Sequence, residues 1–205
     1  MTIRLHRGDL PDLSAYKGAV AIDTEAMGLD PNRDRLCVVQ LSPGDGSADV
    51  VQIGAGQRKA PNIERLLADK SILKIFHFAR FDLGMLAKTF GVMAAPVYCT
   101  KIASRLARTY TDKHGLKDLA REVLGVDLSK QQQLSDWGAD ELSDAQVSYA
   151  ATDVLHLHAL KEKLDGMLAR EGRGDLAAAC FRFLPDRARL DLAGWAAEDI
   201  FSHSS

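Results

Sequence analysis

Short apolar runs separated by turn residues predict three strands in the first quarter of the chain. Ala19–Ile22 is an apolar run that ends at Asp23. Leu36–Leu41 is rich in β-branched residues, which favour strands. A third run, Ala48–Ile53, follows the turn Pro43–Gly46. Because the connections between these runs are short, we expect an antiparallel meander.

From residue 62 onward, helical and strand spacing of apolar positions alternate, which indicates parallel crossovers. The expected elements are a helix at Asn62–Asp69, a strand at Ile72–Phe76, a helix at Phe81–Phe90 ended by Gly91, a strand at Val97–Tyr98 and a helix from Ile102. Beyond Leu116 the apolar spacing predicts helix throughout. We therefore predict an α/β fold with a mixed central sheet flanked by helices. Residues 1–205 form one domain, of which about 170–205 is a C-terminal helical extension.

Composition narrows the class of protein without naming an activity. The 205 residues are 46% hydrophobic and 26% charged, which is typical of one folded domain. No apolar run approaches membrane-spanning length, and Met1–Leu10 lacks the apolar core of a signal peptide. We therefore expect a cytoplasmic protein with no membrane partner.

The three cysteines form no CxxC pair, which argues against a disulfide framework or a zinc ribbon. A net charge of −2 does not by itself indicate a nucleic-acid binder.

Two acidic residues stand out at the end of the first predicted strand. Asp23 and Glu25 are two positions apart, so strand alternation places both side chains on one face. Such close carboxylates repel each other unless a cation lies between them. A solvated end of the strand explains this pair equally simply. Asp82 follows another strand near the start of a helix, where an acid also stabilises the helix dipole.

A helical pair completes the acidic set. Tyr149 and Asp153 are one turn apart and share a helix face, and the intervening Ala150 and Ala151 allow a sheet to approach closely. Apolar neighbours indicate that Asp153 lies at the edge of a buried face, where a carboxylate needs a partner. Carboxylate oxygens suit Mg²⁺ or Mn²⁺, and several around one point suit two ions roughly 3.5–4 Å apart.

Three segments carry a family resemblance. Asp23-Thr24-Glu25, His77–Asp82 and Tyr149–Asp153 resemble, in order and spacing, the three motifs of the DEDD 3′→5′ exonucleases, tyrosine subclass. Lys130–Trp137 is similar to the RNase D group. Three further segments resemble the short nanoRNase C family, namely Arg33–Leu41, Thr100–Ser104 and Asp199–Ser204.

This resemblance implies a fold, a reaction and an assembly. The fold would be RNase H-like, and the assembly a ring-shaped homo-octamer. The enzyme would use two divalent ions, Mg²⁺ or Mn²⁺, to hydrolyse short single-stranded RNA, including dinucleotides, from the 3′ end to nucleoside 5′-monophosphates. No additional RNA-binding domain is expected, because the chain ends about fifty residues after Asp153. An RNase D-like trimmer of RNA 3′ ends, a DNA exonuclease and a binding module with an inactive site are the alternatives.

The resemblance also implies roles for the motif residues. Asp23, Glu25 and Asp153 would hold the first metal, Asp23 would bridge to the second, and Asp82 would support that second metal. Tyr149 would orient the attacking water.

Candidate substrate contacts lie beside the motifs. Thr24 lies within the first motif and Gly28 follows it, where it permits close approach of a nucleotide. Leu29 could wedge against a base or, equally, fold into the core. His77 could bond the substrate or be structural.

A basic stretch offers a further contact surface. Residues 101–121 carry a net charge of +4 and include an aromatic residue, Tyr110. We expect Arg108, Tyr110, Lys113 and His114 to form a substrate loop, although a solvated helix face would show the same charge. The aromatic residues of the tail, from Phe181 to Phe201, suggest an oligomer interface or simple packing on the core.

Overall fold

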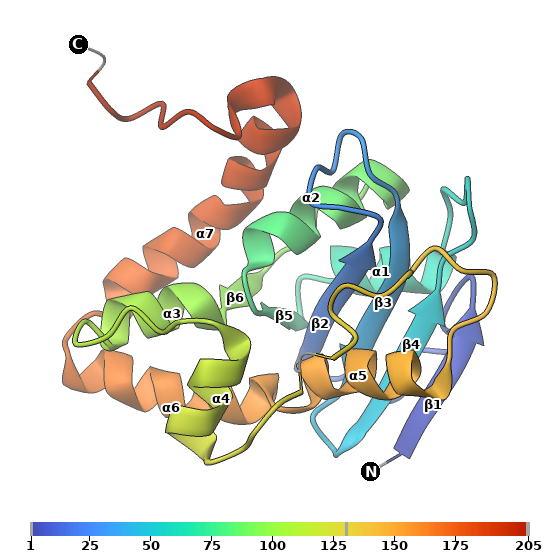
Figure 1. The fold of residues 1–205 in the computed structure, drawn as a ribbon. Coiled ribbons are helices and arrows are strands. Elements are labelled where there is room, and N and C mark those ends of the chain that lie inside the picture. The colour runs from blue at the N-terminus through green and yellow to red at the C-terminus, as the bar shows by residue number, and fades with distance from the viewer. Residues whose placement is uncertain (1, 130, 204–205) are drawn as a thin grey trace.

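The computed structural model describes residues 2–129 and 131–203 and contains a six-stranded mixed sheet (Figure 1). The strands are β1 (Thr2–Arg7), β2 (Ala19–Ala26), β3 (Leu36–Ser42), β4 (Ser47–Gln52), β5 (Leu73–Phe76) and β6 (Val97–Cys99). Their order across the sheet is β1-β4-β3-β2-β5-β6. The pairs β2–β3 and β3–β4 are antiparallel, which confirms the predicted meander. β5 lies parallel to β2, and β6 parallel to β5, as the alternation of strands and helices predicted.

The edge strand β1 was not predicted, because its sequence has no apolar run. It pairs in parallel with β4. Polar contacts hold it there: Arg4 Nε and His6 Nε2 lie 2.7 Å from Asp49 Oδ1. Tyr16 donates to the other oxygen of the same carboxylate at 2.6 Å. Polar contacts with the buried Asp49 of β4 thus hold β1 at the edge of the sheet, where an inner strand is held mainly by apolar packing.

Seven α-helices surround the sheet in the described part of the chain. They are α1 (Pro61–Ala68), α2 (Ala79–Phe90), α3 (Thr100–Ala107), α4 (Leu116–Leu124), α5 (Asp144–Leu155), α6 (Leu157–Arg170) and α7 (Gly174–Leu190), which continues into a π-helical turn, η1 (Asp191–Trp195). The prediction of continuous helix beyond Leu116 is wrong between α4 and α5. The described residues of that segment form no helix; Leu128 and Trp137 are buried, and Trp137 belongs to a hydrophobic core.

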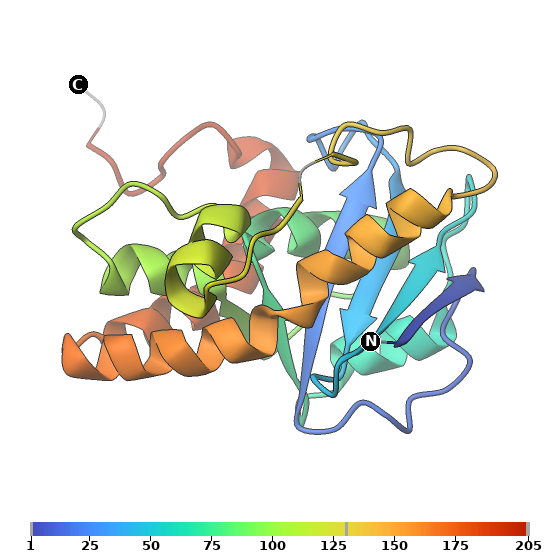
Figure 2. The same cartoon turned by 60° about the horizontal axis from the view of Figure 1, so that its bottom comes forward.

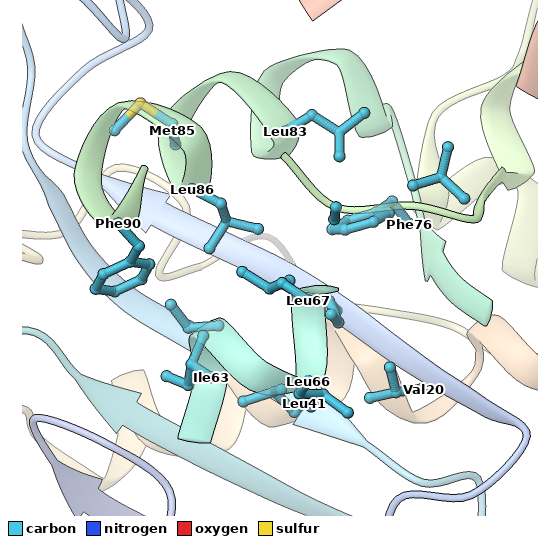
Figure 3. Packing of buried hydrophobic residues seen from close by; sticks show 14 of the residues in the cluster. Val20, Leu41, Ile63, Leu66, Leu67, Phe76, Leu83, Met85, Leu86 and Phe90 are labelled. Atoms are coloured by element: carbon cyan, nitrogen blue, oxygen red, sulfur yellow. The ribbon is translucent and has the colours of Figure 1, made fainter. Parts of the chain in front are cut away.

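Two hydrophobic cores lie on opposite faces of the sheet. On one face, Val20 and Ile22 of β2 pack with side chains of α1 and α2 (Figure 3). On the other, Ala21 packs with residues of α5, including Ala150 and Ala151, which are fully buried. Figure 2 shows α5 lying across the strands and α6 continuing beyond the sheet beside α3 and α4. Because β2 is covered on both faces, its two sets of alternating side chains face different helices.

The C-terminal helix α7 packs on α2 and β6 and ends near the start of α2 (Figure 1). The predicted helical extension is correct as far as Trp195, but residues 196–203 are not helical. Lys130 and Ser204, which belong to segments of the family resemblance, lie outside the described residues. Within the described ranges, no helix combines the length and the apolar character that crossing a bilayer requires.

Candidate active site

Two acidic side chains share one face of β2. Ala21, Asp23 and Glu25 alternate to the side of the sheet that α5 covers. Thr24 points to the opposite side, where its hydroxyl donates to Asp82 Oδ1 at 2.6 Å. The predicted common face of Asp23 and Glu25 is therefore confirmed, and Thr24 ties the strand to a third carboxylate.

The helical pair comes from α5. A capping box fixes the start of this helix: the Ser143 hydroxyl accepts from the Gln146 backbone, and the Gln146 side chain accepts from the Ser143 backbone at 3.0 Å. The helix carries Asp153 to β2, where carboxylate oxygens of Asp23, Glu25 and Asp153 lie within 4.8 Å of one another. Tyr149 lines the same cleft one turn earlier.

Asp82 enters the site from the first turn of α2. β5 delivers the chain to Phe78, which adopts a left-handed conformation with φ 69° before the helix begins at Ala79. This sharp turn places Asp82 beneath the cleft, 2% exposed, with the Thr24 hydroxyl as its partner.

Burial raises the proton affinity of all four carboxylates, and neighbouring acids raise that of Asp23 and Glu25 further. Burial, followed by the charges of Asp82 and Asp153, raises the pKa of Asp23 well above its ordinary value. Burial and Asp153 raise the pKa of Glu25 to about 8. Burial also raises the pKa of Asp82 and of Asp153 to about 7. Burial and close spacing thus disfavour the charged forms of these acids.

A cleft of about 310 Å³ opens over Asp23, Glu25 and Asp153, while Asp82 lies outside its lining. Besides the acids and Tyr149, its walls include His77, Lys101, Lys117, Ser129 and Gln133. The two lysines belong to the basic stretch seen in the sequence, but neither was singled out. Gln133 belongs to the segment similar to the RNase D group. Sequence reasoning therefore detected these stretches without identifying which side chains reach the cleft.

Gln40 was also missed. It is fully buried on β3, opposite Asp23 in the strand register, and its Nε2 donates to Asp23 Oδ2 at 3.4 Å. The available signal was an amide inside the otherwise apolar run Leu36–Leu41. Such a residue is costly to bury unless it serves a neighbouring polar group.

The motifs and their order agree with a comparison against known families. A model described as 3′-5′ exonuclease matches residues 10–169, a range that contains all four carboxylates and Tyr149. The chain belongs to this 3′-5′ exonuclease family.

Curated relatives place the exonuclease in the RNase D group. Ribonuclease D of Gluconacetobacter diazotrophicus is 37% identical over 169 residues, which are 82% of this chain and 42% of the relative. DNA polymerase I of Aquifex aeolicus is 34% identical over 147 residues, 72% of this chain and 24% of the polymerase. The chain spans less than half the length of these relatives.

Solved structures show the same fold over the whole chain. Brucella melitensis NrnC with bound Mg²⁺ is 63% identical with a TM-score of 0.97, and 100% of each chain is covered. A structure of Brucella melitensis NrnC bound to pGG is 64% identical with the same TM-score and coverage. Escherichia coli RNase D is 26% identical with a TM-score of 0.75, covering 84% of this chain and 45% of that one. The exonuclease therefore has the RNase H-like fold that the motifs predicted.

The acidic cluster fits divalent cations. Its donors are all carboxylate oxygens, the ligands that Mg²⁺ and Mn²⁺ prefer. Within residues 2–129 and 131–203, none of Asp23, Glu25, Asp82 and Asp153 forms an ion pair with a basic side chain. A cation would relieve the repulsion that raises their pKa values.

Stabilisation of this exonuclease by metal should increase with pH. The raised pKa values mean that the folded protein without metal binds more protons than the unfolded chain. Ionising these buried acids therefore costs stability as pH rises through about 7 for Asp153 and about 8 for Glu25. Metal displaces those protons. We expect the gain in melting temperature from Mn²⁺, measured against chelator, to grow between pH 6 and 8. A gain that is constant over this range, or falls, would contradict the assignment.

The predicted substrate contacts are only partly brought together. His77 and Thr24 line the cleft. Burial and Lys101 lower the pKa of His77 to about 3, so its imidazole is neutral, and its Nδ1 lies 2.9 Å from Thr100 Oγ1. The Thr24 hydroxyl is occupied by Asp82, so its side chain has a structural partner.

Gly28 and Leu29 lie on the loop after β2. Leu29 is 86% exposed, so the alternative in which it folds into the core is wrong. A Cβ at Gly28 would lie 2.2 Å from Asp34 Oδ2, so the glycine is needed to admit that carboxylate. The same carboxylate accepts from the Asp30 backbone at 3.0 Å and thereby shapes the loop that presents Leu29.

The predicted substrate loop requires a correction at Arg108. Its side chain is fully buried: it pairs with Glu122 and donates to Ser104 Oγ and the Lys113 carbonyl, both at 3.0 Å. Arg108 therefore fastens the loop from inside and does not face a phosphate. This burial could not be predicted from the residue pattern, because an arginine in a basic stretch is usually solvated.

The other three loop residues do not line the cleft. Tyr110 is 74% exposed and Lys113 is also exposed. The Nδ1 atom of His114 lies 2.9 Å from Ser104 Oγ. Their contact with substrate stays a prediction.

Replacing Arg108 should affect stability more than the chemical step. Arg108→Met leaves Glu122 and two loop acceptors without their donor, and we expect a loss of roughly 1–3 kcal/mol in the free energy of unfolding. Arg105→Met removes an exposed guanidinium from the same helix and is the matched control. Urea unfolding of both variants measures the difference. Equal stability of the two would show that Arg108 does not fasten the loop.

Proposed function

We propose that this chain is a two-metal-dependent 3′-5′ exoribonuclease that hydrolyses short oligoribonucleotides, including dinucleotides, to nucleoside 5′-monophosphates. The observation that carries the proposal is the cluster of Asp23, Glu25 and Asp153 at the floor of a small cleft. Full-length similarity to Brucella melitensis NrnC, which has been solved with Mg²⁺ and with pGG, supports it.

The carboxylates divide into two sets around this floor. Asp23, Glu25 and Asp153 would hold one ion, and Asp23 together with Asp82 would hold the second. When bound, such ions lower the pKa of water and stabilise charge on the leaving oxygen. In the reaction, a water oxygen bonds to phosphorus while the bond from phosphorus to the 3′ oxygen breaks, and that oxygen leaves as a hydroxyl.

Tyr149 would hold the attacking water through its hydroxyl. Burial, followed by the charge of Asp153, raises the pKa of Tyr149 above its ordinary value. The hydroxyl therefore stays protonated at neutral pH and donates a hydrogen bond, so the tyrosine positions the water and does not act as a base.

Substrate would lie between the acidic floor and the basic wall of the cleft. Lys101 and Lys117 stand in that wall, where ammonium groups would bind phosphate oxygens. Exposed Leu29, on the loop after β2, would wedge against a base, with close approach at Gly28. A volume of about 310 Å³ is at the small end of ligand pockets, which favours short substrates over long ones.

We also propose that the protein forms a homo-oligomer, with eight copies as the expected number. It would act in the cytoplasm, with residues 1–205 as one exonuclease domain. Exposed apolar side chains at the end of the chain support an interface there, because Trp195, Ile200 and Phe201 are 43%, 42% and 73% exposed. Light scattering of the wild type and of Phe201→Ser tests this. A monomeric wild type, or an assembly that the variant leaves unchanged, would contradict the interface.

Cleavage of end-labelled substrates tests the function. We would incubate 5′-labelled RNAs of two, seven and twenty nucleotides, and matched DNAs, with Mn²⁺, Mg²⁺ or chelator. Metal-dependent loss of nucleotides from the 3′ end, fastest for the dinucleotide, is expected. Cleavage of long RNA with the dinucleotide left intact would support an RNase D-like trimmer. Faster cleavage of DNA than of RNA would support a DNA exonuclease, the alternative with which the similarity to a DNA polymerase I agrees.

A further inference from the structure

A bidentate ion pair joins the active-site helix α2 to the C-terminal segment. Arg80, in the first turn of α2, donates through Nε and Nη2 to the two carboxylate oxygens of Asp191, the Nη2 contact being 2.7 Å. Arg80 Nη2 also donates to the Ala196 carbonyl at 2.6 Å. These groups are 111 positions apart in the sequence, and Asp191 is only 13% exposed. Charge-assisted paired bonds of this kind fix orientation as well as distance.

The partner segment is itself held in place. Arg187 donates to Asp191 Oδ1 at 2.7 Å and to the Trp195 carbonyl at 2.5 Å. Gly194, with φ 109°, lets the chain turn back so that these carbonyls face the two guanidinium groups. The Leu192 carbonyl accepts from Asn32 Nδ2 at 3.3 Å, on the loop that follows β2. The segment Asp191–Ala196 thus contacts the loop after the first acidic motif, at Asn32, and the second motif itself, at Arg80.

The first turn of α2 needs such support. Phe78 precedes it in a left-handed conformation, and no side chain caps the helix. A non-glycine residue in this conformation costs of order 1–3 kcal/mol and persists only when its surroundings determine it. Asp82 lies half a turn after Arg80, so movement of this turn moves the carboxylate. Thr24 restrains Asp82 from the sheet side, and Arg80 restrains the same turn from the outer side.

We propose that Arg80 and Asp191 are positioning residues: their ion pair makes the C-terminal segment part of the scaffold that sets Asp82 for metal binding. The inference rests on the proposed function, because it concerns the same site. It predicts that a change made far along the chain, at Asp191, alters metal affinity and turnover more than substrate binding. Replacing a residue that holds a metal ligand in position typically lowers metal affinity or activity 10- to 100-fold.

The test compares Arg80→Met, Asp191→Asn, the double variant and Arg80→Lys. We expect kcat to fall about tenfold in each of the first two, the half-saturating Mn²⁺ concentration to rise about tenfold, and KM for the dinucleotide to change less than threefold. The double variant should resemble Asp191→Asn, because Asp191→Asn already removes the ion pair that Arg80→Met removes, together with the contact to Arg187. Arg80→Lys keeps the charge and should recover part of kcat. Calorimetric titration with Mn²⁺ in the absence of substrate should show the same loss of affinity.

The matched control is Arg189→Met. Arg189 also pairs with a carboxylate near the end of α7, Asp186 at 2.6 Å, but forms no hydrogen bond or ion pair with α2 among the described residues. It should leave kcat and Mn²⁺ affinity unchanged. A lower melting temperature with unchanged kinetics and Mn²⁺ affinity in Arg80→Met would overturn the inference, and so would additive losses in the double variant. A wild type that cleaves no RNA would instead reject the proposed function, while the calorimetric comparison still tests the ion pair.

Discussion

Asp23→Asn should abolish hydrolysis while raising the stability of the metal-free protein. Asp23 lies between the other acids: its carboxylate is within 4.8 Å of Glu25 and Asp153, and it also feels the charge of Asp82. Asparagine has nearly the same shape but cannot supply a negative ligand. We expect kcat/KM for the dinucleotide to fall by about 1000-fold or more, equivalent to about 4 kcal/mol of transition-state stabilisation. Asp153→Asn should behave in the same way.

The expected change in melting temperature distinguishes a metal-binding carboxylate from one that only stabilises the fold. In chelator, removing the charge of Asp23 relieves repulsion, and the melting temperature should rise by roughly 2–4 °C for each kcal/mol relieved. Mn²⁺ should then stabilise the variant less than the wild type. Glu141→Gln is the control, since that side chain is 85% exposed and does not line the cleft. Near-wild-type turnover by Asp23→Asn, or a lower melting temperature in chelator, would reject the site.

Local pattern was enough to predict most of the fold. The meander, the parallel strands and the helices up to α4 follow from apolar spacing, because β2 to β5 bury near-continuous apolar runs. The edge strand β1 was invisible, since its stability comes from contacts with Asp49, 45 positions after Arg4. The prediction of helix between α4 and α5 was wrong, because helical spacing is present on either side, at Leu116–Leu124 and Val147–Leu157, and was extended across a segment whose described residues form no helix.

The acidic centre could be predicted because each member has a local signature. Asp23 and Glu25 have strand spacing, and Tyr149 and Asp153 have helical spacing. What spacing cannot show is which distant groups meet them. Gln40 reaches Asp23 through a strand register. Arg108 points inward only because Glu122 lies across from it. Both facts depend on tertiary packing, so a basic stretch or a polar strand position does not reveal them.

Deleting one hydroxyl, in Tyr149→Phe, should slow turnover without weakening substrate binding. The phenyl ring keeps the contact with Trp137, whose ring centroid lies 6.0 Å away, so packing in this part of the core is retained. Only the protonated hydroxyl beside Asp153 is lost. We expect kcat to fall about 10- to 100-fold with KM within threefold, the usual cost of removing a group that orients a reacting ligand. Steady-state kinetics on the dinucleotide measure both constants.

Tyr98→Phe is the matched control for this deletion. Tyr98 is also a buried tyrosine next to an apolar core, and its raised pKa has the same first cause, burial. It lies on β6 and does not line the cleft, so its hydroxyl has no reacting partner. If Tyr149→Phe and Tyr98→Phe reduce kcat equally, the loss reflects general packing. If Tyr149→Phe changes KM alone, the hydroxyl binds substrate and does not hold the water. A selective loss of kcat at Tyr149 is the result that the geometry of α5 demands, because the helix brings this one hydroxyl to the carboxylates of β2.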